Sequence, residues 1–152
     1  MSKPYLTPSA IILLLVRERG GRKQILLQRR QNTGFADGLW DFSCAGKVEH
    51  GESMTATAVR EAKEELGITV APEDLQFAVF VHKCDKPCNL IYYNAYFICQ
   101  KFDGEPEICE LKKCSDLKWF DIDNLPEDLI DDRKCALKAY KDGVRYLEYG
   151  WE

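Results

Sequence analysis

The chain has 152 residues, of which 45% are hydrophobic and 30% are charged, so its length and composition are typical of one globular domain. Its 21 basic and 25 acidic residues give a net charge of −4, which disfavours nonspecific nucleic-acid binding because that binding depends on a basic surface. The longest apolar run, residues 10–16, is far shorter than the ~20 residues that span a bilayer. We therefore expect a single domain over residues 1–152 that neither crosses a membrane nor binds a nucleic-acid polymer.

The first part of the chain predicts a strand pair and a helix. We expect a buried strand at residues 9–16 and its hairpin partner at residues 24–30. A polar loop at residues 31–38 and short extended pieces at residues 40–48 then lead to a helix at residues 54–66. Ser53 suits the N-cap of the helix, and Gly67 supplies its C-terminal stop. Ala58, Ala62 and Leu66 recur every four residues, so this helix has a narrow face of small residues suited to close packing on a sheet.

The second part of the chain predicts more strands and a closing helix. Strands are expected at residues 75–81 and 90–99, around a turn at Asp85-Lys86-Pro87, and a short strand at residues 117–120. A turn at residues 123–126 precedes an expected closing helix at residues 133–147. Because strands and helices are interspersed, the fold class is a mixed, layered α/β domain.

The cysteine count favours reduced thiols. Seven cysteines are an odd number, and charged residues follow the first apolar run where a signal peptide would have its cleavage site. We therefore predict a cytoplasmic protein. Zinc is the alternative, because His82, Cys84 and Cys88 lie close together and Cys109 and Cys114 follow, but their spacings differ from the paired Cys-x2-Cys pattern.

Three glutamates on the predicted helix could form a metal site. Glu61, Glu64 and Glu65 are spaced i, i+3 and i+4, so they project from one side of the helix within an arc of roughly 100°. Their mutual repulsion would be relieved by a hard divalent cation, and Mg²⁺ prefers oxygen ligands. A solvated helix face, with Arg60 paired to Glu64, explains the spacing equally well.

The wider pattern around these glutamates resembles the Nudix box. It reads Gly-x5-Glu-x7-Arg-Glu-x2-Glu-Glu-x-Gly-apolar, and the matching residues are Gly46, Glu52, Arg60, Glu61, Glu64, Glu65, Gly67 and Ile68. Ala62 stands where the family more often has a larger aliphatic residue. The stretches before residue 40 and after residue 110 are also similar to family members. The resemblance implies a Nudix (MutT-like) hydrolase with a Nudix-type α/β/α sandwich around a mixed sheet.

The resemblance also implies roles for the residues of the box. Glu61, Glu64 and Glu65 would bind Mg²⁺, with Mn²⁺ as an alternative ion, and Glu61 would be the general base. The carbonyl group of Ala45 would join the metal ligands. Glu110 is the best match to a further carboxylate from a later loop, with Glu105 and Glu107 as competitors.

The same resemblance implies an ion pair that positions the metal ligands and a set of side chains that contact the substrate. Glu52 and Arg60 would form an ion pair that orients the metal ligands. The candidate substrate contacts are phosphate-binding cations and aromatic rings that could stack on a base: Arg29, Arg30, Lys47, Phe35 and Trp40. For each cation, surface exposure is the plain alternative, and core packing is the alternative for each ring.

These residues predict a hydrolase that depends on a divalent metal. Its substrate would be a small-molecule phosphoanhydride, namely a nucleoside diphosphate linked to another moiety. Pyrophosphohydrolysis of a nucleoside triphosphate is the first expectation. One alternative is an enzyme similar to isopentenyl-diphosphate isomerase, which Cys44 suggests, although only His50 and His82 are present to supply its histidine ligands. The other alternative is a noncatalytic Nudix-fold binding or regulatory module, which would not need the complete set of carboxylates.

Overall fold

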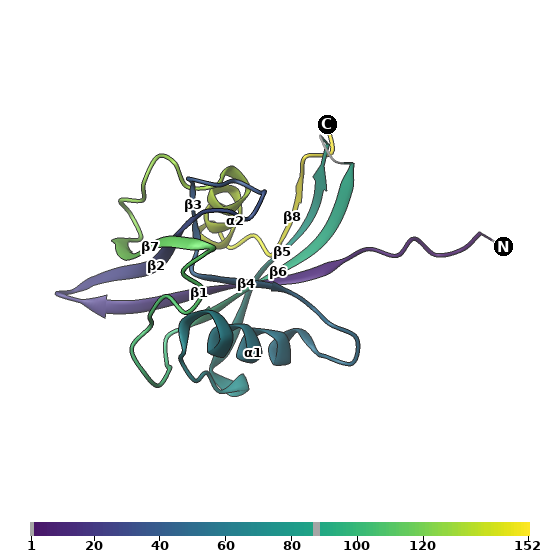
Figure 1. The fold of residues 1–152 in the computed structure, drawn as a ribbon. Coiled ribbons are helices and arrows are strands. Elements are labelled where there is room, and N and C mark those ends of the chain that lie inside the picture. Colours follow the sequence, from purple (N-terminus) through teal and green to yellow (C-terminus); the bar gives the residue numbers. More distant parts are fainter. Residues whose placement is uncertain (1, 87–88) are drawn as a thin grey trace.

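The computed structural model describes residues 2–86 and 89–152, and within them a mixed sheet of eight strands lies between two helices (Figure 1). The helices are α1 (Met54–Leu66) and α2 (Asp131–Lys141), and a short 3-10 helix spans Pro72–Asp74. The strands are β1 (Ser9–Arg19), β2 (Arg22–Arg30), β3 (Trp40–Phe42), β4 (Cys44–Lys47), β5 (Leu75–Asp85), β6 (Leu90–Cys99), β7 (Cys114–Asp121) and β8 (Tyr146–Tyr149). The predicted α/β/α sandwich around a mixed sheet is confirmed.

Strand β1 is central to the sheet, whose order is β3-β2-β1-β6-β5-β8. It runs parallel to β6, and it changes its antiparallel partner along its length. Residues 10–13 pair with β4, whereas residues 16–19 pair with β2, and β2 also pairs with β7 on its other edge. This division lets β2 and β4 diverge from a common neighbour, and the candidate site lies where they do so.

The apolar run of β1 divides between two cores, because successive side chains of a strand point to opposite faces. Ile12, Leu14 and Val16 pack with residues of α2, such as Ala136 and Leu137. The alternate set, at positions 11, 13 and 15, packs with α1. The uninterrupted apolar sequence of this strand is therefore the pattern of a sheet covered on both faces.

Helix α1 begins and ends as its sequence predicts. The Oγ atom of Ser53 accepts a hydrogen bond from the amide of Ala56. Gly67 adopts a left-handed conformation with φ 70°, and its amide donates to the carbonyl group of Lys63. Ala58 and Ala62 are fully buried, so the small-residue face does lie against the sheet.

The prediction of one closing helix at residues 133–147 is wrong. Helix α2 ends at Lys141, and Gly143 follows with φ 75°, a conformation that interrupts a helix. The chain then forms β8, which pairs in parallel with β5 and gives this long strand a partner on its outer edge. The predicted turn between β5 and β6 includes Pro87, which lies outside the described residues. No helix in the described ranges is long and apolar enough to cross a membrane.

Candidate functional site

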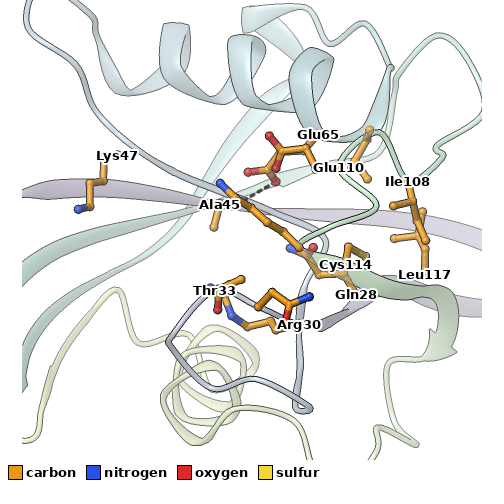
Figure 2. A pocket seen from close by; sticks show the side chains of 13 residues that line it. Gln28, Arg30, Thr33, Ala45, Lys47, Glu65, Ile108, Glu110, Cys114 and Leu117 are labelled. Atoms are coloured by element: carbon orange, nitrogen blue, oxygen red, sulfur yellow. Dashed lines mark hydrogen bonds between the residues drawn. The ribbon is translucent and has the colours of Figure 1, made fainter.

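A cavity of about 480 Å³, hereafter the first cavity, lies between α1 and the ends of β2 and β4 (Figure 2). Glu65 of α1 and Glu110 of the loop before β7 lie on one side of it, and Gln28 and Arg30 of β2 lie on the other. Lys47 and Lys113 also line the cavity. Its lining therefore combines two carboxylates with three cations, Arg30, Lys47 and Lys113, among neutral side chains.

Glu61 approaches the backbone of β4 at Gly46. A Cβ atom at position 46 would overlap the carboxyl group of Glu61, so any side chain there would displace the glutamate. The Glu61 side chain is only 13% exposed in this position. The first glycine of the box is thus needed because the carboxylate of the helix lies directly over its α-carbon.

Glu65 lies beside Glu61, and one of its oxygens accepts a hydrogen bond from the amide of Ala45 at 3.3 Å. Burial raises the pKa of its carboxyl group to about 9, with further contributions from the adjacent Glu61 and from Glu110. Without a cation, this carboxyl group is therefore protonated at neutral pH. A divalent ion would relieve both the desolvation and the repulsion that raise the pKa.

Arg60 organises the remaining carboxylates of the box. Its Nε and Nη2 atoms donate to the two oxygens of Glu52 at 2.7 and 2.9 Å, a bidentate arrangement. Hydrogen bonds from Arg60 lower the pKa of Glu52 to about 2. Its Nη1 atom also donates to Glu61 at 2.8 Å and to Glu64 at 3.3 Å. The structure thus brings Glu52 and Arg60 together as the resemblance implies, and it adds two contacts that the resemblance did not include.

The donor set fits a hard divalent cation in its chemistry. Glu61, Glu65 and Glu110 offer carboxylate oxygens beside the backbone of Ala45, whereas Glu64 lies on the exposed side of the helix. As the side chains stand, no three His, Cys, Asp or Glu side chains of the described residues are grouped closely enough to hold an ion. Arg60 binds two of the glutamates, so binding of a cation would require them to exchange this partner. Glu105 and Glu107 do not line the cavity.

A second cavity, of about 380 Å³, adjoins the first and shares Arg30, Ala45 and Lys47 with it. Phe35 and Tyr92 contribute aromatic rings, and the remaining polar residues are Asn94, Lys83, Asp85 and Arg133. Phe35, Arg30 and Lys47 were expected from the sequence. Asn94, the one amide side chain within the mostly apolar and aromatic sequence of β6, was a signal in the sequence that motif reasoning did not use.

Arg29 and Trp40 line neither cavity. Trp40 is only 5% exposed and packs edge-on against Phe120 in the core, so the expectation that it stacks on a base is wrong. Arg29 lies over the ring of Trp40 and pairs with Asp128. The alternation of β2 explains this, because Gln28 and Arg30 face the cavity and Arg29 must face the other way.

An ion-pair network, here called the buried network, lies beneath the second cavity. Asp41 is fully buried and binds Arg133 at 2.7 Å through one oxygen and Arg30 at 3.0 Å through the other. Asp132 is also buried and binds Arg133 at 3.2 Å and Lys83 at 3.0 Å. Arg30 additionally donates to the carbonyl group of Phe35 at 2.8 Å. The network thus connects α2 to the loop that carries Phe35.

The comparisons with known proteins agree with this fold. The NUDIX domain model matches residues 6–140, so the chain belongs to the NUDIX domain family. A solved MutT NUDIX hydrolase from Burkholderia pseudomallei is 27% identical, with a TM-score of 0.76 over 88% of this chain and 98% of that one.

Curated relatives carry several different names. Isopentenyl-diphosphate Delta-isomerase 2 of Photorhabdus laumondii is 35% identical over 64% of this chain and 55% of its own length. NAD-capped RNA hydrolase NudC of Stutzerimonas stutzeri is 33% identical over 95% of this chain and 44% of its own. Dihydroneopterin triphosphate diphosphatase of Escherichia coli is 34% identical over 53% and 55%. The chain thus spans about half the length of these relatives.

Proposed function

We propose that the chain hydrolyses a phosphoanhydride bond of a nucleotide-like diphosphate compound, with Mg²⁺ as its cofactor and a nucleoside triphosphate as the first substrate candidate. The observation that carries the proposal is the position of Glu65, which lies beside Glu61 and lines a cavity that also includes Arg30 and Lys47. A protein gains nothing for its own stability from this repulsion. A cation bound with a diphosphate would complement both walls of the cavity.

Each residue of the site has a role in this proposal. Glu61, Glu65 and Glu110, with the carbonyl group of Ala45, would hold the cation, and Glu64 would join them from the exposed side. The bound ion neutralises phosphate charge and lowers the pKa of water. Glu52 holds Arg60, and Arg60 in turn orients Glu61 and Glu64. Arg30 and Lys47 would bind phosphate oxygens that face away from the carboxylates.

The reaction needs only water besides the substrate. A water molecule attacks one phosphorus, its proton passes to the carboxylate of Glu61, and the bond from that phosphorus to the bridging oxygen breaks. The leaving phosphate takes the electron pair of that bond. For a nucleoside triphosphate attacked at the α-phosphorus, the products are a nucleoside monophosphate and pyrophosphate.

The isomerase alternative is disfavoured by the placement of Cys44 and the histidines. Cys44 is fully buried, and burial, followed by the charge of Glu65, raises the pKa of its thiol well above the usual range. It is therefore a neutral thiol packed in the core beside α1. Neither cavity, as lined by the described residues, includes a histidine. The complete set of box carboxylates also favours an enzyme over a noncatalytic module, which would not need all of them.

A substrate panel with Mg²⁺ tests the proposed function. Nucleoside triphosphates, nucleotide sugars, dinucleoside polyphosphates and prenyl diphosphates would each be incubated with the protein, and the products would be identified. We expect metal-dependent hydrolysis of at least one nucleotide, reduced about a hundredfold in Glu65→Gln and retained in the exposed matched control Glu127→Gln. Isomerised prenyl diphosphate, or binding without turnover of any compound, would contradict the proposal.

We further propose that the protein acts in the cytoplasm on small molecules, as one domain. The support is the odd number of cysteines, of which the six described ones form no disulfide. The acidic net charge supports a small substrate rather than a nucleic-acid polymer.

A further inference from the structure

Aromatic side chains gather on the part of the sheet that β5, β6 and β8 form. Four of them lie on the same face of the sheet as α1: Phe80, His82, Tyr93 and Tyr146. A fifth, Trp151, follows β8, and its ring centroid lies 4.6 Å from that of His82. The Nε1 atom of Trp151 also donates to the carbonyl group of His82 at 2.8 Å. These five side chains are hereafter called the aromatic face.

The aromatic face is ordered by contacts among its own rings, yet it stays in water. Tyr93 packs against Phe80 and His82, with ring centroids 5.7 and 5.1 Å apart, and Tyr146 stacks on Phe80 at 6.3 Å. Tyr93, Trp151 and Tyr146 are nevertheless 37%, 43% and 53% exposed. None of the five lines either cavity of the candidate site, as the described residues define them. An exposed apolar patch away from the site indicates a surface for another chain.

The segment before β1, residues 3–8, has the composition that such a surface binds, and it is hereafter called the arm. It contains Pro4 and Pro8, and a proline together with the residue before it favours an extended backbone. Between the prolines, the apolar side chains of Tyr5 and Leu6 are 68% and 87% exposed. Extended segments that contain proline dock on surfaces lined by aromatic rings, so the arm and the aromatic face match in kind.

The arm leaves the sheet next to the aromatic face without lying on it. The carbonyl group of Pro8 accepts a hydrogen bond from the amide of Tyr93 at 3.0 Å, and the pairing of β1 with β6 begins at Ser9. Before this point the arm runs away from the sheet (Figure 1). To reach its own aromatic face it would have to turn back over β6, whereas its two prolines favour an extended course. The arm is therefore better placed to reach a second copy.

Charge and surface area are also consistent with a second copy as the partner. Lys3 is the one charged side chain among the first 16 residues, and Glu148 lies in register with His82 and accepts a hydrogen bond from Tyr146. An aromatic side chain carries about 150–250 Å² of surface, so one arm on one face would cover roughly 500 Å². Two such contacts would bury about 1,000 Å², which is the lower limit for a specific interface.

We propose that two copies of this chain associate by exchanging arms, so that Tyr5 and Leu6 of each copy lie on the aromatic face of the other. The pair is closed, because each copy supplies one arm and one face under two-fold symmetry. Its small interface makes it a dimer that dissociates on dilution. Each copy keeps its own candidate site, because the exchanged surface lies outside both cavities.

The first test is sedimentation velocity of the full chain from micromolar to millimolar concentration. We expect a monomer that becomes a dimer as the concentration rises. Leu6→Asp on the arm and Tyr146→Lys on the aromatic face should each raise the dissociation constant about tenfold or more. Leu111→Asp, at an apolar side chain that is 71% exposed and lies outside both surfaces, is the matched control. A parent that stays monomeric throughout, or an equal loss in the control, would overturn the inference.

The second test mixes the two variants and distinguishes arm exchange from other pairings. In a mixed pair, the unchanged arm of the Tyr146→Lys copy meets the unchanged face of the Leu6→Asp copy. In the other contact, the introduced carboxylate meets the introduced ammonium group. The mixture should therefore dimerise at a concentration at which each variant alone is monomeric. Absence of this rescue would overturn the inference, as would parental dimerisation of Leu6→Asp alone, which is expected if two aromatic faces pack directly on each other.

Discussion

Two groups of charged residues in this protein differ in whether the folded chain itself supplies enough cations to balance their carboxylates. In the box cluster (Glu52, Arg60, Glu61, Glu64 and Glu65), three of the four carboxylates share one guanidinium group, and burial raises the pKa of the fourth, Glu65, to about 9. In the buried network (Arg30, Asp41, Lys83, Asp132 and Arg133), three cations surround two carboxylates. The network therefore has more cations than carboxylates, and within the described residues Oδ1 of Asp132 is its one carboxylate oxygen that lacks a hydrogen-bond partner. The box cluster, in contrast, retains excess negative charge that a ligand can neutralise.

The largest effect is expected from breaking the buried network. Arg133→Met removes the cation that lies between Asp41 and Asp132, and it leaves two buried carboxylates with fewer partners. The free energy of unfolding, measured by urea denaturation, should fall by about 3–5 kcal/mol. Lys138→Met, on an exposed face of the same helix, should change it little. A loss below about 1 kcal/mol would show that the network is not a stabilising unit.

The box cluster should respond in its activity rather than its stability. Glu61→Gln, Glu64→Gln and Glu65→Gln keep the size of the side chain but remove charge that binds the cation. Turnover should fall by about a hundredfold, since even the partners of metal ligands are each worth about ten- to a hundredfold. Mg²⁺ should raise the melting temperature of the parent more than that of each variant. If Glu64→Gln and Glu65→Gln both turn over at the parental rate, the assignment of the metal ligands is wrong.

The difference between the two groups also explains how much the sequence could predict. The box cluster lies on one helix and its preceding loop, and the local caps Ser53 and Gly67 define that helix. Residue spacing places the three glutamates of the helix on one side, and the resemblance to the Nudix box adds the pair of Glu52 and Arg60. In the buried network, Asp41 and Arg133 are 92 positions apart and meet only because the sheet and α2 are packed. Asn94 has no motif around it, so its place in a cavity follows from the fold alone.

Arg60→Ala tests whether the ion pair of the box cluster contributes less to stability than the buried network does. Arg60 and Glu52 are 24% and 17% exposed, so their pair is less buried than the network, and its loss should lower the melting temperature by only a few degrees. Activity should fall about tenfold, because Glu61 and Glu64 lose their common partner. Arg60→Lys should restore stability better than activity, because lysine cannot form the bidentate contact. Parental melting and parental turnover in Arg60→Ala would mean that this arginine is only a surface residue.

The two ends of the box cluster should respond oppositely to pH in the absence of metal. The lowered pKa of Glu52 means that its contribution to stability is complete above its usual pKa near 4.5 and is lost as pH falls towards about 2. The raised pKa of Glu65 means that its contribution is complete below about 4.5 and is lost as pH rises towards about 9. Melting curves of the metal-free parent should show both slopes. Glu52→Gln should flatten the acidic slope and Glu65→Gln the alkaline slope, and an unchanged profile in either variant would contradict the corresponding assignment.

No effect is expected from removing zinc. The spacing of the cysteines is unlike that of a zinc site, and Cys88, the nearest partner of Cys84 in sequence, lies outside the described residues. Elemental analysis of the purified protein should find no stoichiometric zinc, and a strong chelator should leave its metal-free melting temperature unchanged. One equivalent of tightly bound zinc, with unfolding on its removal, would contradict this prediction.

The central position of β1 has a consequence for the synthesis of the chain. This strand is translated before β6, its parallel partner, and their pairing begins where Ser9 lies beside Tyr93. Until β6 has been translated, the apolar stretch of residues 11–16 can complete neither core, and such exposed strands are prone to aggregation. We therefore expect this protein to need a chaperone most while its nascent chain still ends before Leu90.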